Sequence, residues 1–392
     1  MNHETRNLLF LTGAFAALLT GVQTVQQYVT VRFDAAGDVS VGYTSLFIAY
    51  LMFFLGTLVA PFAVAQWGAK RCFLGAAVFY TAFAVSVGIG VESLLYVASV
   101  LVGISAGILW GAYYVYMAGI SSLERRGRNA GVFWAAYSAT TGIGLIASGP
   151  LIESFSIDPV IFGYAGVCVV GLILFVPMDD VRATTTETQT SWRNGFPIIG
   201  SLTVMRLASC IFVTNLTYGL AISFLPLEIA EIAGTEAVGW MSAMFFVIPA
   251  VTSVSLGQLA DKLGRFFAVF SGLGVSLAGL GILYFAHTSA LLFIGILVIT
   301  LGFSILNPVM TALPIDISPE GMTERVTGTF NALTSVGISV GIAIPFLIAD
   351  KTVYIALGTI TVLNIVIILP LARKEMGAIR ELVAVENGRA AG

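Results

Sequence analysis

Twelve apolar runs, most of them about 20 residues or longer, dominate this 392-residue chain. An α-helix needs about 20 mostly apolar residues to cross a bilayer. Only 10% of the residues are charged, whereas a soluble domain carries about 25%, so a charged outer shell is excluded. Barrel strands would alternate over about 10 residues, and these runs do not. We predict an all-α membrane protein with twelve spans, at about 8–31, 41–65, 70–91, 94–118, 129–152, 159–177, 200–225, 237–260, 266–286, 289–313, 326–348 and 353–372.

One long polar segment, which begins at Met178, separates six spans from six. Lys and Arg favour the cytoplasmic side of a membrane. With the N-terminus inside, all 18 basic residues except Arg32 and Lys351 lie on the inner side. We therefore predict a multi-pass protein of the cell membrane with both termini cytoplasmic. Its predicted parts are an N-terminal six-helix bundle, a cytoplasmic linker, a C-terminal six-helix bundle and a cytoplasmic tail, at 1–177, 178–197, 198–375 and 376–392.

Composition also excludes several classes of function. The net charge of −3 argues against nucleic-acid binding. Cys72, Cys168 and Cys210 lie in or beside apolar runs without metal-ligand spacing, so we interpret them as small core residues. No nucleophile–base pair, metal cluster or phosphate-binding loop is visible in the sequence. We therefore expect no enzyme, no cofactor and no metal site.

The two sets of six spans share matched sequence. Gly68 and Gly264 stand 196 positions apart in equivalent inner loops. GVFWAAYS, which begins at Gly131, and GTFNALTS, which begins at Gly328, stand 197 positions apart. Matches in register with the span count indicate an internal duplication, and parallel repeats of this kind place a substrate site near the midplane, between the halves.

The inner loop between spans eight and nine reads GQLADKLGR, with Gly257, Asp261, Gly264 and Arg265. It resembles the G-x-x-x-D-x-x-G-R signature of the major facilitator superfamily. That resemblance implies a twelve-helix fold in two pseudo-symmetric halves and transport by alternating access. It also implies that Asp261 holds the halves in an outward-open state, with span 11 as its partner.

The equivalent loop of the first half, PFAVAQWGAKRCF, lacks the acid. Gly68, Lys70 and Arg71 remain, but Ala65 occupies the position of the acid. We therefore predict an asymmetric latch, in which the second loop has the stronger effect on access.

The first half resembles one branch of the superfamily more closely, the UNC (uncoordinated, ion-channel-regulatory-like) branch. The stretches that carry this resemblance are VGYTSLFIAYLMFFLGTLVAP (41–61), WGAKRCFLGAAVFY (67–80), GISAGILWGAYYVYM (103–117) and GRNAGVFWAAYSATTGIG (127–144). That branch includes transporter-like proteins and eukaryotic regulators or trafficking partners. The resemblance therefore implies either of two functions.

Polar side chains at membrane depth are unfavourable, so those that share one helix face are candidates for a substrate pathway. Span 1 carries Gln23, Gln26 and Gln27 at such a spacing. Bonding between helices is the alternative for these amides, and packing is the alternative for the aromatic residues. The candidate substrate-binding residues are Gln23, Gln27, Trp110, Tyr113, Trp134, Tyr137, Asn215, Tyr218 and Asn331.

Charge is scarce along this pathway, because spans 1, 4, 5, 7, 10 and 11 have no Asp or Glu near their centres. Arg206 is the one strong candidate, either as an interfacial anchor or as a gate. His3 and His287 fall in a tail and an outer loop, away from any relay. An uncharged cavity of Gln, Asn, Trp and Tyr suits a neutral or amphipathic organic solute.

Two functions follow from these patterns. We favour a transporter of a small organic solute that works as a monomer in the lipid bilayer, with a proton or sodium as a possible coupling ion. The alternative is a membrane regulator or chaperone of another membrane protein that moves no solute itself. Gating in the transporter would depend on Gly68, Lys70, Arg71, Arg206, Gly257, Asp261, Gly264 and Arg265.

Overall fold

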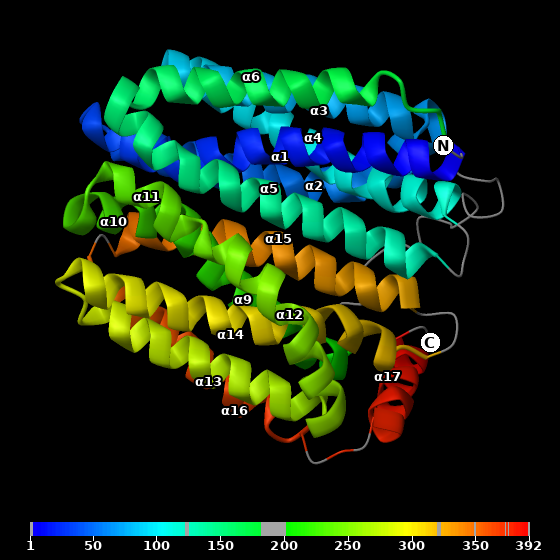
Figure 1. Cartoon of the computed structure of the whole chain (residues 1–392). Coiled ribbons are helices and arrows are strands. Elements are labelled where there is room, and N and C mark those ends of the chain that lie inside the picture. The colour runs from blue at the N-terminus through cyan, green and yellow to red at the C-terminus, as the bar shows by residue number, and fades with distance from the viewer. Residues whose placement is uncertain are drawn as a thin grey trace. The chain divides into compact units, whose positions relative to one another are not determined.

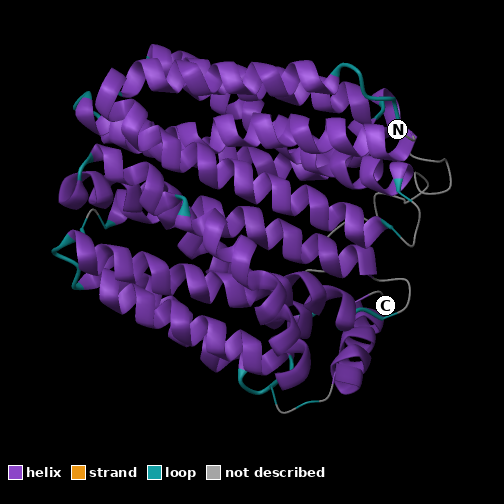
Figure 2. Ribbon diagram, in the orientation of Figure 1, coloured by secondary structure: helices purple, strands orange, loops and turns teal. Residues whose placement is uncertain are grey.

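The computed structural model describes residues 3–121, 125–181, 201–319, 323–348, 350–372, 374 and 376–390. Every regular element in these ranges is a helix (Figure 2). The first six are α1 (His3–Ala35), α2 (Val39–Trp67), α3 (Ala69–Ile89), α4 (Glu92–Ile120), α5 (Arg126–Phe155) and α6 (Ile157–Phe175). After the linker come α9 (Leu202–Ser223), α10 (Leu225–Ala233), α11 (Thr235–Ser242), α12 (Met244–Leu263), α13 (Arg265–Tyr284), α14 (Ser289–Asp316), α15 (Thr323–Leu347), α16 (Thr352–Ile368) and α17 (Met376–Ala390).

The helices match the predicted spans. Within the described ranges, 11 helical segments are long and apolar enough to cross a membrane, and α16 adds a shorter apolar helix of 17 residues. Large apolar side chains stay exposed on the helices, among them Val97, Ile143 and Leu363. Such side chains are unfavourable in water but suit the hydrocarbon of a bilayer. The prediction of an all-α, multi-pass membrane protein is confirmed.

One predicted span is built from two helices. The span expected at 237–260 is α11 followed by α12, whereas the span expected at 200–225 is α9, which α10 follows directly. Pro226 stands in the first turn of α10, where its missing N–H costs no helical hydrogen bond. A hydropathy pattern shows the length of an apolar run, but it does not show an interruption of the helix within the run.

The chain divides into two compact units. The first unit holds residues 1–189 and 221–250, and the second holds 190–220 and 251–392. In the first unit, α11 packs beside α5, as Figure 1 shows in green. The helices α2 and α4 approach so closely that a methyl group added to Gly107 would overlap the backbone of Gly56. The division into two six-helix halves stays a prediction from the repeat.

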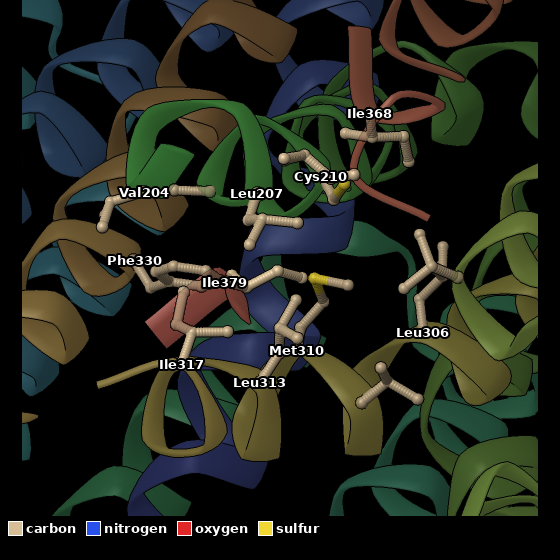
Figure 3. Close-up of a cluster of buried hydrophobic side chains, with 14 of the residues drawn as sticks. Val204, Leu207, Cys210, Leu306, Met310, Leu313, Ile317, Phe330, Ile368 and Ile379 are labelled. Carbon is tan, nitrogen blue, oxygen red and sulfur yellow. The ribbon is translucent and has the colours of Figure 1, made fainter. Parts of the chain in front are cut away.

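The second unit has a continuous apolar core, part of which Figure 3 shows. Leu207 and Cys210 of α9 lie in this core with Leu313 of α14 and Phe330 of α15. The predicted tail contributes to it, because residues 376–390 form α17, and Ile379 and Val383 of that helix are buried in the same cluster (Figure 1). Sequence reasoning missed this packing. Most of the predicted linker lies outside the described residues.

Candidate functional site

Four of the predicted substrate-binding residues gather on α4 and α5 of the first unit. The Trp110 and Trp134 rings stack, with centroids 5.5 Å apart and an interplanar angle of 9°. The Tyr137 ring lies 5.6 Å from that of Trp134, and the Tyr113 ring lies 6.4 Å from it. We call Trp110, Tyr113, Trp134 and Tyr137 the aromatic surface. Trp134 is 43% exposed, so part of its side chain remains accessible on this surface.

A phenylalanine of α1 packs against the aromatic surface. The Phe15 ring is fully buried, with its centroid 5.8 Å from Trp110, 5.7 Å from Tyr113 and 5.1 Å from Phe133. Edge-to-face contacts of this kind add about 0.5–1.5 kcal/mol per pair beyond the buried area. The sequence prediction missed Phe15 and Phe133, because a phenylalanine within an apolar run carries no distinguishing signal.

The three glutamines of α1 have different environments. The Tyr50 hydroxyl of α2 donates a hydrogen bond of 3.4 Å to Gln26 Oε1, so bonding between helices accounts for this amide. The Oε1 atoms of Gln23 and Gln27 are buried without a hydrogen-bond partner. Gln27 is only 2% exposed, whereas Gln23 is half-buried. Two of the three amides therefore retain an unused acceptor.

The predicted residues of the second unit do not form a comparable group. Asn215 Nδ2 donates to the Ile211 carbonyl one turn earlier in α9, at 2.8 Å. Tyr218 stacks on Phe303, with ring centroids 5.8 Å apart. Asn331 is exposed on α15. Local bonding and packing account for Asn215 and Tyr218, and a substrate role for these three residues stays a prediction.

The first inner loop receives a carboxylate from a distant part of the chain. Gly68 joins α2 to α3 at a φ of +81°, and a methyl group built on it would lie 2.5 Å from Asp180 Oδ1. The neighbouring backbone is also held, because the Ala69 N–H donates to the Val181 carbonyl at 2.9 Å. This loop has Ala65 where the second loop has an acid, but Asp180, at the start of the predicted linker, lies beside Gly68.

Asp180 sits where its charge is favourable. Lys70 and Arg71 stand in the first turn of α3, the positive end of the helix dipole, where cations are disfavoured. A carboxylate near this helix end offsets both the positive end of the dipole and the positive charges of Lys70 and Arg71. The preceding residue, Asp179, is fixed as well, by Arg6 Nη2 at 2.6 Å and Asn7 Nδ2 at 2.7 Å.

The second inner loop has the same backbone geometry but a different ion pair. Gly264 has a φ of +97° and precedes α13. Arg265 Nε lies 2.9 Å from Oδ2 of Asp316, the last residue of α14. Gly257 and Asp261 lie in α12, and the Asp261 side chain is outside the described part of the chain. The predicted partner of Asp261 on span 11 therefore stays a prediction.

Arg206 lies one turn into α9, close to α17. Glu386 of α17 accepts hydrogen bonds from Ser201 Oγ at 2.6 Å and from the Thr203 N–H at 3.0 Å. Burial alone would raise the pKa of Glu386, but these hydrogen bonds and the Arg206 charge outweigh it and hold the pKa below its ordinary value. Arg206 thus has a carboxylate neighbour at the start of α9, and its predicted gating role stays a prediction.

Other sequence interpretations can be compared with the structure. Cys72, Cys168 and Cys210 are buried and unbridged, as expected for small core residues. Among the residues that the structure describes, no group of three or more His, Cys, Asp or Glu could hold a metal ion.

Two family models match the chain. Residues 207–389 match the Major Facilitator Superfamily, and residues 36–229 match the model described as ion channel regulatory protein UNC-93. The second match covers much of the region whose sequence resembles the UNC branch.

Individual relatives agree with these matches. The UNC93-like protein MFSD11 of Xenopus laevis is 33% identical over 142 residues, which is 34% of this chain and 32% of that protein. The chain therefore spans about a third of the length of this curated relative. The uncharacterized MFS-type transporter MJ1560 of Methanocaldococcus jannaschii is 22% identical over 270 residues, with 64% of this chain and 69% of that protein covered.

Solved structures share the fold over nearly the whole chain. A peptide transporter POT in complex with sulfate aligns with a TM-score of 0.75 at 13% identity, covering 96% of each chain. The inward-open xylose transporter XylE from E. coli aligns with a TM-score of 0.75 at 15% identity, covering 96% of this chain and 98% of its own. At these identities the likeness shows the fold alone. Together with the two matched regions, it confirms the sequence resemblance: the chain has the fold of major facilitator transporters, residues 207–389 are similar to the Major Facilitator Superfamily, and residues 36–229 are similar to UNC-93.

Proposed function

We propose that this protein is a membrane transporter that moves a small neutral or amphipathic organic solute by alternating access. The observation that carries the proposal is the stacked Trp110–Trp134 pair, with Trp134 43% exposed although its partners are largely buried. A partly exposed indole within a membrane protein offers a surface on which a flat solute or a sugar ring can stack. The superfamily fold, shared with peptide and xylose transporters, supports the same proposal.

The chemistry around the aromatic surface selects for an uncharged solute. Its members carry two indoles and two phenols, and Gln23, about two turns along α1 from Phe15, carries an amide oxygen that has no partner. A solute hydroxyl or N–H would satisfy this oxygen, whereas a strongly charged group would find no counter-ion among these side chains. We also propose Asn215, Tyr218 and Asn331 as substrate contacts of the second half.

The test uses the purified full-length protein. Thermal unfolding across a panel of sugars, aromatic compounds and amphipathic solutes identifies a ligand, and uptake into liposomes then measures transport. Trp134→Ala should weaken solute binding by about 2- to 12-fold, because aromatic stacking contributes about 0.5–1.5 kcal/mol. Trp67→Ala is the matched control, since Trp67 is exposed at the end of α2, outside the aromatic surface. If no solute stabilises or crosses, the transporter proposal fails.

A second candidate function is regulation of another membrane protein. The match of residues 36–229 to the ion channel regulatory protein UNC-93 favours it. A regulator needs no solute, so its partner's activity should survive Trp134→Ala. Loss of both solute uptake and solute stabilisation upon this substitution would favour the transporter.

The remaining features of the proposal concern topology and state. We propose cytoplasmic termini, a location in the cell membrane and a functional monomer, with Gly68, Asp261 and Arg265 among the gating positions. Labelling of single cysteines added at each terminus in intact cells tests the topology, and the mass of the detergent-solubilised protein tests the monomer.

A further inference from the structure

Helix α9 begins at a carboxylate that α17 supplies. Ser201 Oγ donates to Glu386 Oε2 at 2.6 Å, and the Thr203 N–H donates to the same oxygen at 3.0 Å. Thr203 Oγ1 donates to the other oxygen, Glu386 Oε1, at 2.9 Å. The first N–H groups of a helix have no partner within it, and the positive end of its dipole favours an acid. Glu386 therefore caps the start of α9 with both of its oxygens.

The packing of α17 holds this carboxylate in place. Ile379 and Val383 of α17 are fully buried in the same apolar core as Val204 of α9. Arg380 Nη2 of α17 donates to the carbonyl of Asp316, the last residue of α14, at 2.8 Å. The helix α17 is thus bound to the start of α9 and to the end of α14.

Helix α1 binds a carboxylate near its own start. Arg6 Nη2 and Asn7 Nδ2 donate to Asp179 Oδ2, at 2.6 Å and 2.7 Å. The Asp179 N–H donates in return to Asn7 Oδ1 at 3.2 Å. Asn7 is fully buried, and Asp179 follows the end of α6 by four residues. The side chain and the backbone of Asp179 are therefore both bound to the first two turns of α1.

The two helix starts are equivalent under the internal repeat. Asn7 and Thr203 stand 196 positions apart, which is also the offset between Gly68 and Gly264. Buried residues continue at this offset, with Leu11 and Leu207, Thr12 and Ala208, and Ala14 and Cys210. The two acids stand 207 positions apart, so they are equivalent by contact and not by register. In each predicted half, an acid that follows the last span binds the same level of the first span.

We propose that Asp179 and Glu386 are equivalent inner clasps, each of which ties the chain after the last span of its half to the start of the first span. Each clasp lies wholly within one compact unit. Most of the predicted linker lies between Asp179 and Ser201, so the clasps hold the chain on both sides of it. When the halves rock against each other, the clasps keep the first and last spans of each half moving as one body. This role in access rests on the proposed transport function, whereas the clasps themselves do not.

Hydrogen–deuterium exchange of the full-length protein tests the clasps. Glu386→Ala should speed exchange of the Thr203 N–H about 10-fold or more, because this N–H loses a hydrogen bond to a charged group. Alanine keeps the helix propensity of α17. Asp179→Ala should speed exchange of the Ala69 N–H by about 2- to 12-fold, since this N–H donates to the carbonyl of Val181, two residues after Asp179. Each variant should leave the other unit unchanged.

Glu381→Ala is the matched control, because Glu381 is an exposed acid of the same helix as Glu386. The clasps are overturned if the Thr203 N–H exchanges at the wild-type rate in Glu386→Ala, or if Glu381→Ala has the same effect. A variant that speeds exchange equally in both units would also overturn them, because it would report a general loss of stability. If an alanine variant does not fold, Asp179→Asn and Glu386→Gln should show the same pattern with smaller increases, since they remove only the charge.

Uptake into liposomes tests the role of the clasps in access. Both alanine variants at the clasps should take up solute more slowly than the wild type, with the thermal stabilisation by solute unchanged, because neither acid belongs to the aromatic surface. Wild-type rates of uptake in both variants would overturn this role. Faster exchange in the variants, together with no uptake by any form of the protein, would support the clasps and contradict the proposed transport function.

Discussion

The contact between Gly68 and Asp180 can be tested by a double-mutant cycle. Gly68 has a φ of +81° and a ψ of 158°, a region that only glycine adopts readily, so Gly68→Ala strains the backbone by about 1–3 kcal/mol. The added methyl group would also lie 2.5 Å from Asp180 Oδ1 and displace the carboxylate. Losing an exposed charge at a helix end, such as that of Asp180, costs about 0.3–1 kcal/mol. Gly68→Ala should therefore be about 0.3–1 kcal/mol less harmful in an Asp180→Ala background than in the native one.

Cys72 offers a local readout of this cycle. Its thiol is buried one turn into α3, and its N–H donates to the Gly68 carbonyl at 3.3 Å. In a background where Cys168 and Cys210 are replaced by alanine, the rate of Cys72 alkylation reports the opening of this helix end. An interaction of about 0.3–1 kcal/mol corresponds to about a 2- to 5-fold difference between the effects of Gly68→Ala in the two backgrounds.

Gly264→Ala is the matched control. Gly264 has a similar backbone, with a φ of +97° and a ψ of 150°, but nothing lies within 4 Å of an added methyl group. This substitution should lower the unfolding temperature through backbone strain alone and leave the Cys72 alkylation rate unchanged. The reasoning is refuted if Gly68→Ala has the same effect on Cys72 with and without the Asp180 carboxylate.

Four further substitutions test three other contacts. Glu386→Gln should lower the unfolding temperature at neutral pH. Because the pKa of Glu386 is depressed in the folded protein, the carboxylate stabilises the fold above its ordinary pKa of 4.5 and loses this effect as the pH falls below that pKa. The difference in unfolding temperature between variant and wild type should therefore close at low pH, and a difference that does not depend on pH would contradict this. Asp316→Asn should cost less than about 1 kcal/mol, since its pair with Arg265 is partly exposed, and a larger loss on thermal unfolding would indicate a wider network. Tyr28→Phe and Ser148→Ala should each lower the free energy of unfolding by about 1–3 kcal/mol. Thermal unfolding of the double mutant should show a loss of stability much smaller than the sum of the two single losses.

The sequence by itself determined the membrane fold. Crossing a bilayer requires a length of apolar chain, and length and hydropathy are both properties of the sequence alone. Helical periodicity likewise placed Trp110, Tyr113, Trp134 and Tyr137 on shared faces, and the structure brings these four together. The two inner loops were matched because a duplication preserves spacing between positions, which requires no coordinates.

Only the tertiary structure decided which distant segments meet. Asp180 reaches Gly68 across 112 positions of sequence, and Glu386 reaches Ser201 across 185, and neither acid lies within a recognisable motif. The support of the aromatic surface by Phe15 also depends on how three helices pack, and an apolar residue type gives no indication of its neighbours. The missing acid of the first loop was therefore visible in the sequence, whereas the carboxylate that lies beside this loop was not.

Thr140 and Thr141 show the same limit at the scale of one residue. They are adjacent, identical in type and part of one helix, so sequence reasoning treats them alike. In the structure the Thr140 hydroxyl donates to its own helix, whereas the Thr141 hydroxyl is buried without a partner. A rotation of about 100° per residue around the helix axis turns the two side chains in different directions. The surroundings of each side chain are supplied only by the packing of the helices.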